Sequence, residues 1–359
     1  MIRTAVIGFG LSARVFHLPF IARSTHFQLV GISTSQQDAA LYWPEVTIYP
    51  DAASLIAQTD ASLIVITAPN RAHFALCEAA LLAGKDVLVE KPLAISAAEA
   101  RALEALASRQ QRRLAVFHNR RFDDDFQAVQ QLIQSGTLDA VQVMVSRFDR
   151  FRPKVQARWK ESAEPGNGVL YDLAPHLLDQ AIALFGKPDA ITASCLNLRA
   201  SGDESGGAVD YFQLRLDYTA RPAIPARQVV LSSSPYCAHP APRFELHGAA
   251  GSFISYRLDP QEQILRDALQ QSPNKPAAVF ASDAWQQRAS GRSGEHWHAT
   301  GSAIIPFPAS DYAGFYQQLA QFLDYKGPAP VPLAEAILGL ELIELALQSS
   351  HEQRTLHVN

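Results

Sequence analysis

Three side chains in this sequence combine a type suited to proton transfer with a position that suggests a shared site. Lys91 follows the apolar run at residues 87–90 and precedes a proline, so it is expected at the carboxyl end of a strand. Asp172 and His176 are four residues apart and would share one face of a helix. A carboxylate beside an imidazole fixes its tautomer and stabilises its protonated form, and a shielded lysine can polarise an oxygen. We expect these groups to move a proton at an oxygen of a small molecule.

A glycine-rich turn near the start of the chain has the form G-x-G-x-x-A. It lies between a strand-like run and a helical pattern, which is the context that such a motif requires. Gly8 would make the tight turn, Gly10 would let the backbone approach a pyrophosphate, and Ala13 would let helix and strand pack closely. We therefore predict a dinucleotide site that includes Gly8, Phe9, Gly10, Ser12 and Ala13. The alternative is a glycine turn in an unrelated α/β protein.

The end of the second predicted strand bears on the choice between NADP and NAD. An acidic residue about 20 positions after the glycines would hold a ribose 2′-hydroxyl and repel a 2′-phosphate. Ser33 and Ser35 stand there instead, and no carboxylate follows before Asp38. Hydroxyl groups can donate to a 2′-phosphate, which favours NADP. No arginine or lysine lies in this stretch, however, so NAD remains possible.

The first 120 residues alternate strand-like runs with helical patterns. The strand-like runs are continuously apolar, as in parallel sheets covered on both faces; they lie at 4–7, 27–32, 63–66, 87–90 and 114–117. Asp51, Asn70 and Ser96 are predicted to begin helices, and Ser96 forms a capping box with Glu99. The pattern predicts a Rossmann domain, a doubly wound parallel sheet, over residues 1–120.

The remaining chain, residues 121–359, predicts a second, α+β domain. Alternating runs at 140–146, 210–218 and 227–232 indicate an open, mostly antiparallel sheet. One helix is expected over 173–185, starting near Asp172 because Pro175 fits only a first helical turn. Residues 270–301 lack a clear period and are expected to form a long loop. Two helices, 312–323 and 333–348, are predicted to close the chain.

Composition excludes several other classes of protein. The net charge of −4 gives no basic field for nucleic acid. The three cysteines lie far apart and form no C-x-x-C pair, which argues against disulfides and thiolate zinc sites. No secretory signal and no apolar stretch of about 20 residues is present. We expect a cytoplasmic protein without membrane or nucleic-acid partners.

The motifs together resemble the Gfo/Idh/MocA family of oxidoreductases. They are G-x-G-x-x-A, Glu90-Lys91-Pro92 and Asp172-x-x-x-His176, and their order covers both predicted domains. Further stretches resemble the subgroup of NADP-dependent scyllo-inositol dehydrogenases, namely residues 117–123, 151–153, 157–159, 170–173 and 209–212. That subgroup usually has a basic residue after the serine, where this chain has Gln36.

The resemblance implies roles for individual residues. Lys91, Asp172 and His176 would be catalytic. The cofactor would be lined by Thr67, Pro69, Asn70, His73 and Glu90, with Asn119, Arg158 and Trp159 near the nicotinamide. Members of the family act on sugars, inositols and related polyols, often as dimers or tetramers packed through the open sheet. A homodimer or homotetramer is therefore expected.

The resulting hypothesis is hydride transfer between NADP(H), or NAD(H), and a secondary alcohol carbon of a polyol, inositol or sugar. A catalytically silent dinucleotide-binding regulatory protein is the alternative. A metal-dependent hydrolase using His296 and His298 fits poorly, since no third ligand is evident, and a surface pair without metal is expected. Arg120 and Arg121, close to the aspartates at 123–125, are expected to form a salt-bridged domain junction.

Overall fold

The computed structural model describes residues 1–359 except 157–160, 200–206, 274 and 310. The chain forms two compact units, each assembled from several segments. The first unit comprises Met1–Asp123, Asp259–Ser290 and Ala309–Ile337, and the second comprises Asp124–Leu258, Gly291–Pro308 and Leu338–Asn359. Segments from the second half of the chain therefore complete the first unit.

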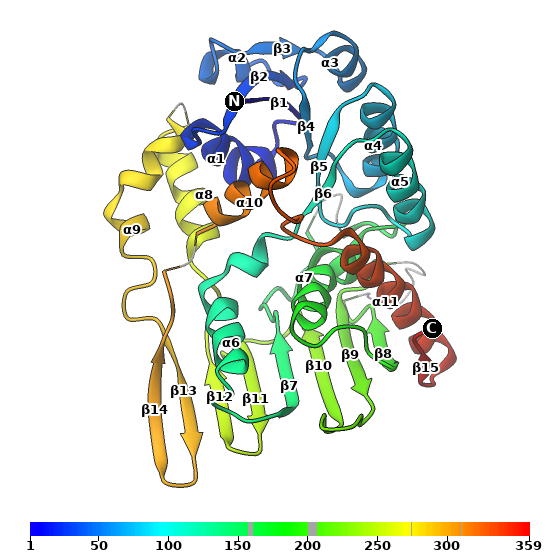
Figure 1. The fold of residues 1–359 in the computed structure, drawn as a ribbon, viewed down its shortest axis with the longest axis vertical. Coiled ribbons are helices and arrows are strands. Elements are labelled where there is room, and N and C mark those ends of the chain that lie inside the picture. Colours follow the sequence, from blue (N-terminus) through cyan, green and yellow to red (C-terminus); the bar gives the residue numbers. More distant parts are fainter. Residues whose placement is uncertain (157–160, 200–206, 274, 310) are drawn as a thin grey trace. The chain divides into compact units, whose positions relative to one another are not determined.

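The first unit contains a six-stranded parallel sheet in the order β3-β2-β1-β4-β5-β6 (Figure 1). This order and the buried, apolar strands confirm the predicted doubly wound sheet. The short strand β3 was not predicted. The strands are β1 (Ile2–Ile7), β2 (Phe27–Ser33), β3 (Thr47–Tyr49), β4 (Leu63–Ile66), β5 (Asp86–Glu90) and β6 (Leu114–Phe117).

The helices of the first unit come from both ends of the chain. Two of the predicted caps are confirmed, since Asp51 accepts a hydrogen bond from Ser54 N and Ser96 accepts one from Glu99 N. The apolar residues of α8, α9 and α10 join the core that the glycine-rich segment and β6 build. The helices are α1 (Leu18–Arg23), α2 (Ala39–Tyr42), α3 (Ala52–Gln58), α4 (His73–Leu82), α5 (Ala97–Arg109), α8 (Gln261–Gln271), α9 (Asp283–Gln286) and α10 (Ala313–Leu323).

The second unit is built on a nine-stranded sheet in the order β14-β13-β12-β11-β7-β10-β9-β8-β15. Only β7 and β10 pair in parallel, so the predicted open, mostly antiparallel sheet is confirmed. The strands are β7 (Val141–Arg147), β8 (Ala190–Leu196), β9 (Tyr211–Tyr218), β10 (Arg227–Ser233), β11 (Phe244–Gly248), β12 (Gly251–Ser255), β13 (Ser293–His298), β14 (Gly301–Pro306) and β15 (Leu356–His357).

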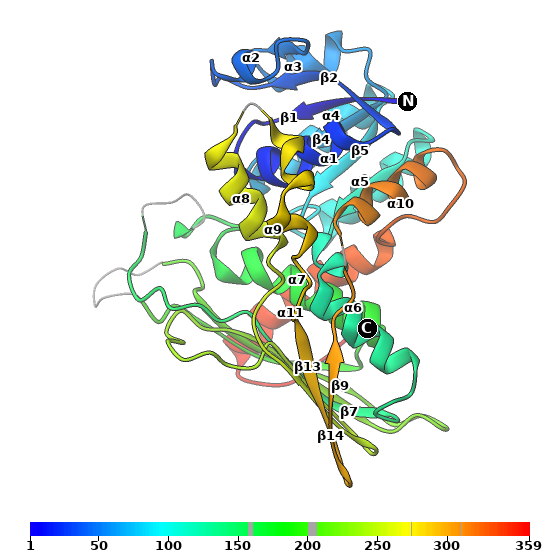
Figure 2. The same cartoon turned by 90° about the vertical axis from the view of Figure 1, so that its left-hand side faces the viewer.

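Helices α6 (Asp124–Gln134), α7 (Gly168–Phe185) and α11 (Leu333–Glu352) run along this sheet (Figures 1 and 2). Phe126 of α6 packs near Phe244 of β11, with 6.5 Å between ring centroids, and Ser349 of α11 accepts a hydrogen bond from Ala193 N of β8. These helices bury one face of the sheet. Among the described residues, no helix is both long and apolar enough to cross a membrane.

The start of α7 differs from the prediction. The helix begins at Gly168, so Pro175 lies in its interior rather than in its first turn. Val169 N donates to Val209 O, which gives the start of the helix a partner outside it. A proline inside a helix costs about 3 kcal/mol. Burial of apolar residues on both sides of Pro175, including Leu170 and Leu178, offsets that cost.

The prediction of a long loop over 270–301 was wrong. Helix α8 extends to Gln271, a 3-10 turn covers Pro276–Ala281, and α9 and β13 follow. Phe280 and Trp285 are buried in the core of the first unit. Each element is too short to show a period in the sequence, and burial of these few large side chains stabilises them instead.

Candidate functional site

The glycine turn is fixed by contacts that only glycine permits. Gly8 has a φ of +101°, and a Cβ there would lie 2.6 Å from Thr67 Oγ1. Thr67 Oγ1 donates to Ile7 O at 2.9 Å, and Gly8 N donates to Ser33 O at 2.9 Å. These bonds join the carboxyl ends of β1, β2 and β4. Open sheets of this type bind their ligands at that edge.

The second glycine has a different reason to be small. Gly10 is exposed, and apart from its two chain neighbours no described residue has an atom within 4 Å of the position that its Cβ would occupy. The backbone there is accessible, which fits the close approach of a pyrophosphate. Ala13, the third small residue, is fully buried at the start of the π-helical turn Ala13–His17, where it packs against the sheet. The turn therefore fits the dinucleotide that its sequence predicts.

Glu90 is a largely buried carboxylate at the end of β5. It accepts a hydrogen bond from the Ser12 hydroxyl, and its Oε1 lies 3.1 Å from His17 Nε2. Tyr316 of α10 extends this series of hydrogen bonds, since its hydroxyl lies 2.8 Å from His17 Nδ1. Burial alone would raise the pKa of Glu90, but the hydrogen bonds and charges of His17, Ser12 and Lys91 together lower it to about 2. Glu90 is therefore an ionised anchor inside the unit.

The backbone of Lys91 is held by the same carboxylate, since Lys91 N donates to Glu90 Oε2 at 3.2 Å. The Lys91 side chain is half-buried directly after β5, and the Lys91–Pro92 peptide bond is cis. Asn119 is buried in a turn just after β6. The predicted residues of the first unit thus collect at the carboxyl ends of neighbouring strands.

His73 is completely buried at the start of α4. Its Nδ1 lies 2.7 Å from Pro92 O and its Nε2 lies 2.9 Å from Ala68 O. Burial lowers the pKa of His73, although both carbonyls oppose this effect. The imidazole connects the segment after β4 to the segment after β5. It therefore helps to position these two segments at the carboxyl ends of the strands while itself remaining buried. Pro69 is exposed there and Asn70 is half-buried.

The second unit has a cavity of about 280 Å³ beside α7, whose wall combines charged side chains with apolar surface. Asp172 lines it. His176, one turn further along α7, is nearly buried, 6.3 Å from the ring of Phe148, and is not among the described lining residues. Arg158 and Trp159 lie outside the described residues. Sequence reasoning missed several lining residues: Arg150, Arg152, Asn197, Arg199, Asp210 and Ser233.

Ion pairs hold part of the cavity wall in place. Arg199 Nε donates to Asp210 Oδ2 at 2.8 Å, and its Nη1 lies 3.3 Å from Glu161 Oε2. Asp210 also accepts a hydrogen bond from Leu198 N at 2.7 Å. The volume is close to the lower end of the ~300–1,000 Å³ typical of ligand sites. The cavity is suited to a small molecule that has both hydrogen-bonding groups and apolar surface.

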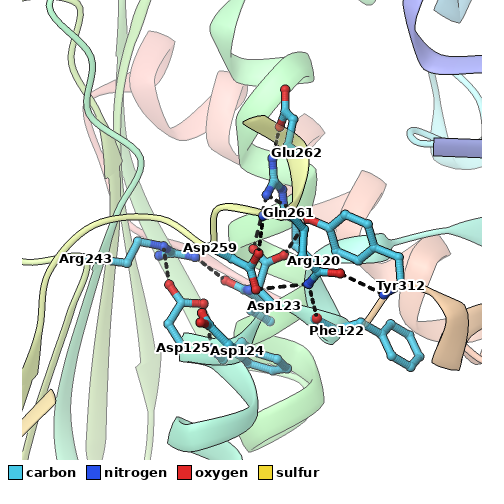
Figure 3. A network of polar contacts seen from close by, with 12 residues as sticks. Arg120, Phe122, Asp123, Asp124, Asp125, Arg243, Asp259, Gln261, Glu262 and Tyr312 are labelled. Atoms are coloured by element: carbon cyan, nitrogen blue, oxygen red, sulfur yellow. Dashed lines mark hydrogen bonds and ion pairs between the residues drawn. The ribbon is translucent and has the colours of Figure 1, made fainter. Parts of the chain in front are cut away.

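The arginines and aspartates around residue 120 form salt bridges (Figure 3). Arg120 pairs with Asp123 and Glu262 and donates to the Tyr312 hydroxyl at 3.1 Å. That hydroxyl donates to Asp123 at 2.9 Å. In the second unit Arg243 lies 3.6 Å from Asp125, and Arg292 pairs with Asp124. The pairs link distant segments within each unit, so their role is structural.

The two histidines of β13 do not form the predicted surface pair, because His296 is nearly buried and only His298 is exposed. Their ring centroids lie 5.3 Å apart. In the part of the chain that the structure describes, no three metal-ligating side chains gather into a site.

Comparison with known proteins agrees with both units. Residues 2–118 match the model of the NAD-binding Rossmann fold of the Gfo/Idh/MocA oxidoreductases, and residues 130–358 match the model of their C-terminal alpha/beta domain. The chain is 38% identical to the uncharacterized oxidoreductase YdgJ of Escherichia coli, over 99% of this chain and 98% of YdgJ. It is 32% identical to the scyllo-inositol 2-dehydrogenase (NADP(+)) IolW of Bacillus subtilis, over 99% and 95% of the two chains.

A solved structure extends the likeness to three dimensions. The oxidoreductase yvaA of Bacillus subtilis superposes with a TM-score of 0.88 at 31% identity, covering 100% of this chain and 99% of the other. The glycine turn, the parallel sheet and the open second sheet thus occur together, as the sequence motifs predict. The chain belongs to the Gfo/Idh/MocA family of NAD(P)-dependent oxidoreductases.

Proposed function

We propose that the protein transfers a hydride between NADP(H) and a secondary alcohol carbon of a polyol, inositol or sugar. The observation that carries this proposal is the cavity of about 280 Å³ whose lining includes Asp172 and other charged side chains. Its size and its charged lining residues suit a small polyhydroxylated molecule, whose hydroxyls can hydrogen-bond to them while its ring carbons meet the apolar part of the wall. The first unit supplies a dinucleotide turn. The likeness to IolW, a scyllo-inositol dehydrogenase, supports this class of substrate.

In the oxidative direction the substrate loses a hydride from carbon and a proton from its hydroxyl, and a carbonyl forms. Bound nicotinamide supplies the hydride acceptor. We assign the hydroxyl proton to the imidazole of His176, and we assign to Asp172 the orientation of the hydroxyl and the stabilisation of the imidazolium. The Lys91 ammonium would polarise the same oxygen as its negative charge develops.

The cofactor preference and the assembly form part of this proposal. Ser33 and Ser35 favour NADP, and the 32% identity to IolW agrees. NAD is the second choice. We also propose a cytoplasmic enzyme, where its cofactor is present, that forms a homodimer or homotetramer through the second sheet.

A panel of inositols, hexitols and aldohexoses tests the reaction. Each compound is incubated with the protein and NADP⁺ or NAD⁺, and the reduced nicotinamide is followed by absorbance. We expect turnover with at least one polyol and its loss in Asp172→Asn. Asp267→Asn, at an exposed aspartate of α8, is the matched control and should retain activity. Cofactor binding without turnover on any compound would contradict the proposal and favour a dinucleotide-binding regulator.

A further inference from the structure

Arg14 lies against two neighbouring aromatic rings beside the glycine turn. Its guanidinium carbon lies 5.1 Å from the centroid of the Phe9 ring and 5.2 Å from that of Tyr42. The two rings are stacked, with an interplanar angle of 30°. Among the described residues, Arg14 has no carboxylate partner. These two cation–π contacts restrain the position of the guanidinium while its N–H groups remain able to donate.

This arginine lies next to the segment that follows β2. Phe9 belongs to the glycine turn, and its carbonyl accepts a hydrogen bond from Gln36 Nε2 at 3.4 Å. Gly8 N bonds to Ser33 O, so the turn and the end of β2 are joined directly. Tyr42 ends α2, the first helix after β2. In a Rossmann fold the ribose 2′ position of the cofactor lies at the end of this strand.

The segment itself offers hydroxyls but no cation. Residues 33–37 contain Ser, Thr and Gln, with no acidic or basic side chain. A 2′-phosphate carries negative charge that hydroxyls alone do not neutralise. Arg14 supplies the missing charge from the glycine turn, since Phe9, which it contacts, accepts a hydrogen bond from Gln36 of this segment.

We propose that Arg14 binds the 2′-phosphate of NADP(H) and sets the preference for NADP over NAD. The inference rests on the proposed function, because it requires a nicotinamide dinucleotide in the first unit. A planar guanidinium makes paired, charge-assisted hydrogen bonds to a phosphate. Phe9 and Tyr42 limit the rotamers of the arginine before the ligand arrives, so less conformational entropy is lost on binding.

The test is a pair of binding titrations on the whole protein, with NADPH and with NADH, followed by quenching of tryptophan fluorescence. Arg14→Met keeps the length of the side chain and removes its charge. Loss of a charged hydrogen-bond partner predicts about ten- to a hundredfold weaker NADPH binding. NADH affinity should not change. The dependence of NADPH affinity on salt should also become shallower in the variant.

Arg23→Met is the matched control, because Arg23 also lies over an aromatic ring, Phe280 at 4.5 Å, but on the far end of α1. It should leave both affinities unchanged. Equal weakening of NADPH and NADH by Arg14→Met would overturn the inference, since the arginine would then only shape the turn. An unchanged preference in Arg14→Met would overturn it as well. If the unmodified protein binds neither nucleotide, the proposed function itself fails.

Discussion

Lys91 is the residue on which the proposed chemistry depends most. Its backbone is fixed by Glu90, and its half-buried side chain follows β5 at the ligand-binding edge of the sheet. Lys91→Ala should reduce turnover by about 10²- to 10³-fold, the usual cost of removing one group that stabilises a developing negative charge. Affinity for NADPH should remain close to that of the unmodified protein. Steady-state kinetics and fluorescence titration measure the two quantities separately.

The chain offers a matched control for this substitution. Lys187 also precedes a proline, but it is exposed in a bend of the second unit. Lys187→Ala should leave turnover unchanged. If Lys91→Ala also retained full turnover, Lys91 would have no part in the mechanism.

Single residues could be predicted from the sequence where one local rule decides their role. Gly8 is an example, because its position in the motif and its positive φ express the same steric requirement. Arg14 and His73 are different. Their roles depend on Tyr42 and Pro92, which folding brings near from other elements. No local pattern encodes these contacts.

At the scale of elements, the Glu90 network joins β5, the π-helical turn and α10. The folded state lowers the pKa of Glu90 from its ordinary value of 4.5 to about 2. A lowered pKa means that the carboxylate stabilises the fold above pH 4.5 and loses this contribution as the pH falls toward 2. Glu90→Gln should therefore destabilise the protein near neutral pH by about 1–3 kcal/mol. It should also flatten the acid side of the stability profile, as measured by urea unfolding at several pH values.

Glu104→Gln is the control, since Glu104 is exposed on α5. It should change neither the stability nor its pH dependence. A Glu90→Gln protein with the full acid dependence of the original would show that Glu90 is not held ionised by His17 and Ser12.

Elements were predictable where their apolar pattern is long or continuous. The parallel strands and the two C-terminal helices are of this kind. The predicted bounds of these two helices agree closely with those of α10 and α11. The start of α7 and the region 270–301 were not predictable in this way. Pro175 is tolerated inside α7 because its neighbours are buried. The short elements around Phe280 owe their stability to tertiary contacts that lie outside the local sequence.

At the scale of the whole molecule, one face of the sheet of the second unit exposes large apolar side chains. Trp297 is 52% exposed and Ile304 is 65% exposed. Strand pairing of Trp297 with Ser252, Ser252 with His247, and His247 with Val143 places Trp297 and Val143 on one face. Exposed apolar patches of this kind mark interfaces. We expect a homo-oligomer, and Trp297→Lys should lower its molar mass in light scattering, because aromatic residues dominate such interfaces.

Leu41→Lys is the control, because Leu41 is 78% exposed on α2 of the first unit. Its mass should equal that of the unmodified protein. A monomeric unmodified protein, or a Trp297→Lys protein of unchanged mass, would contradict this use of the sheet.

The two-part architecture was predictable because the alternation of strands and helices changes character along the chain. The composition of each compact unit was not. Segments Asp259–Ser290 and Ala309–Ile337 complete the first unit although they follow most strands of the second sheet. The sequence of an amphipathic helix such as α10 predicts that its apolar face is buried, but it does not predict which of the two sheets that face packs against.

The most direct test of the central claim is a parallel titration of the purified protein with NADPH and NADH, followed by tryptophan fluorescence. The glycine turn, the open backbone at Gly10 and the position of Arg14 predict saturable binding of both, with NADPH binding more tightly. Equal or tighter binding of NADH would keep the dinucleotide site but contradict the preference for NADP. Absence of binding by both nucleotides would contradict the account as a whole.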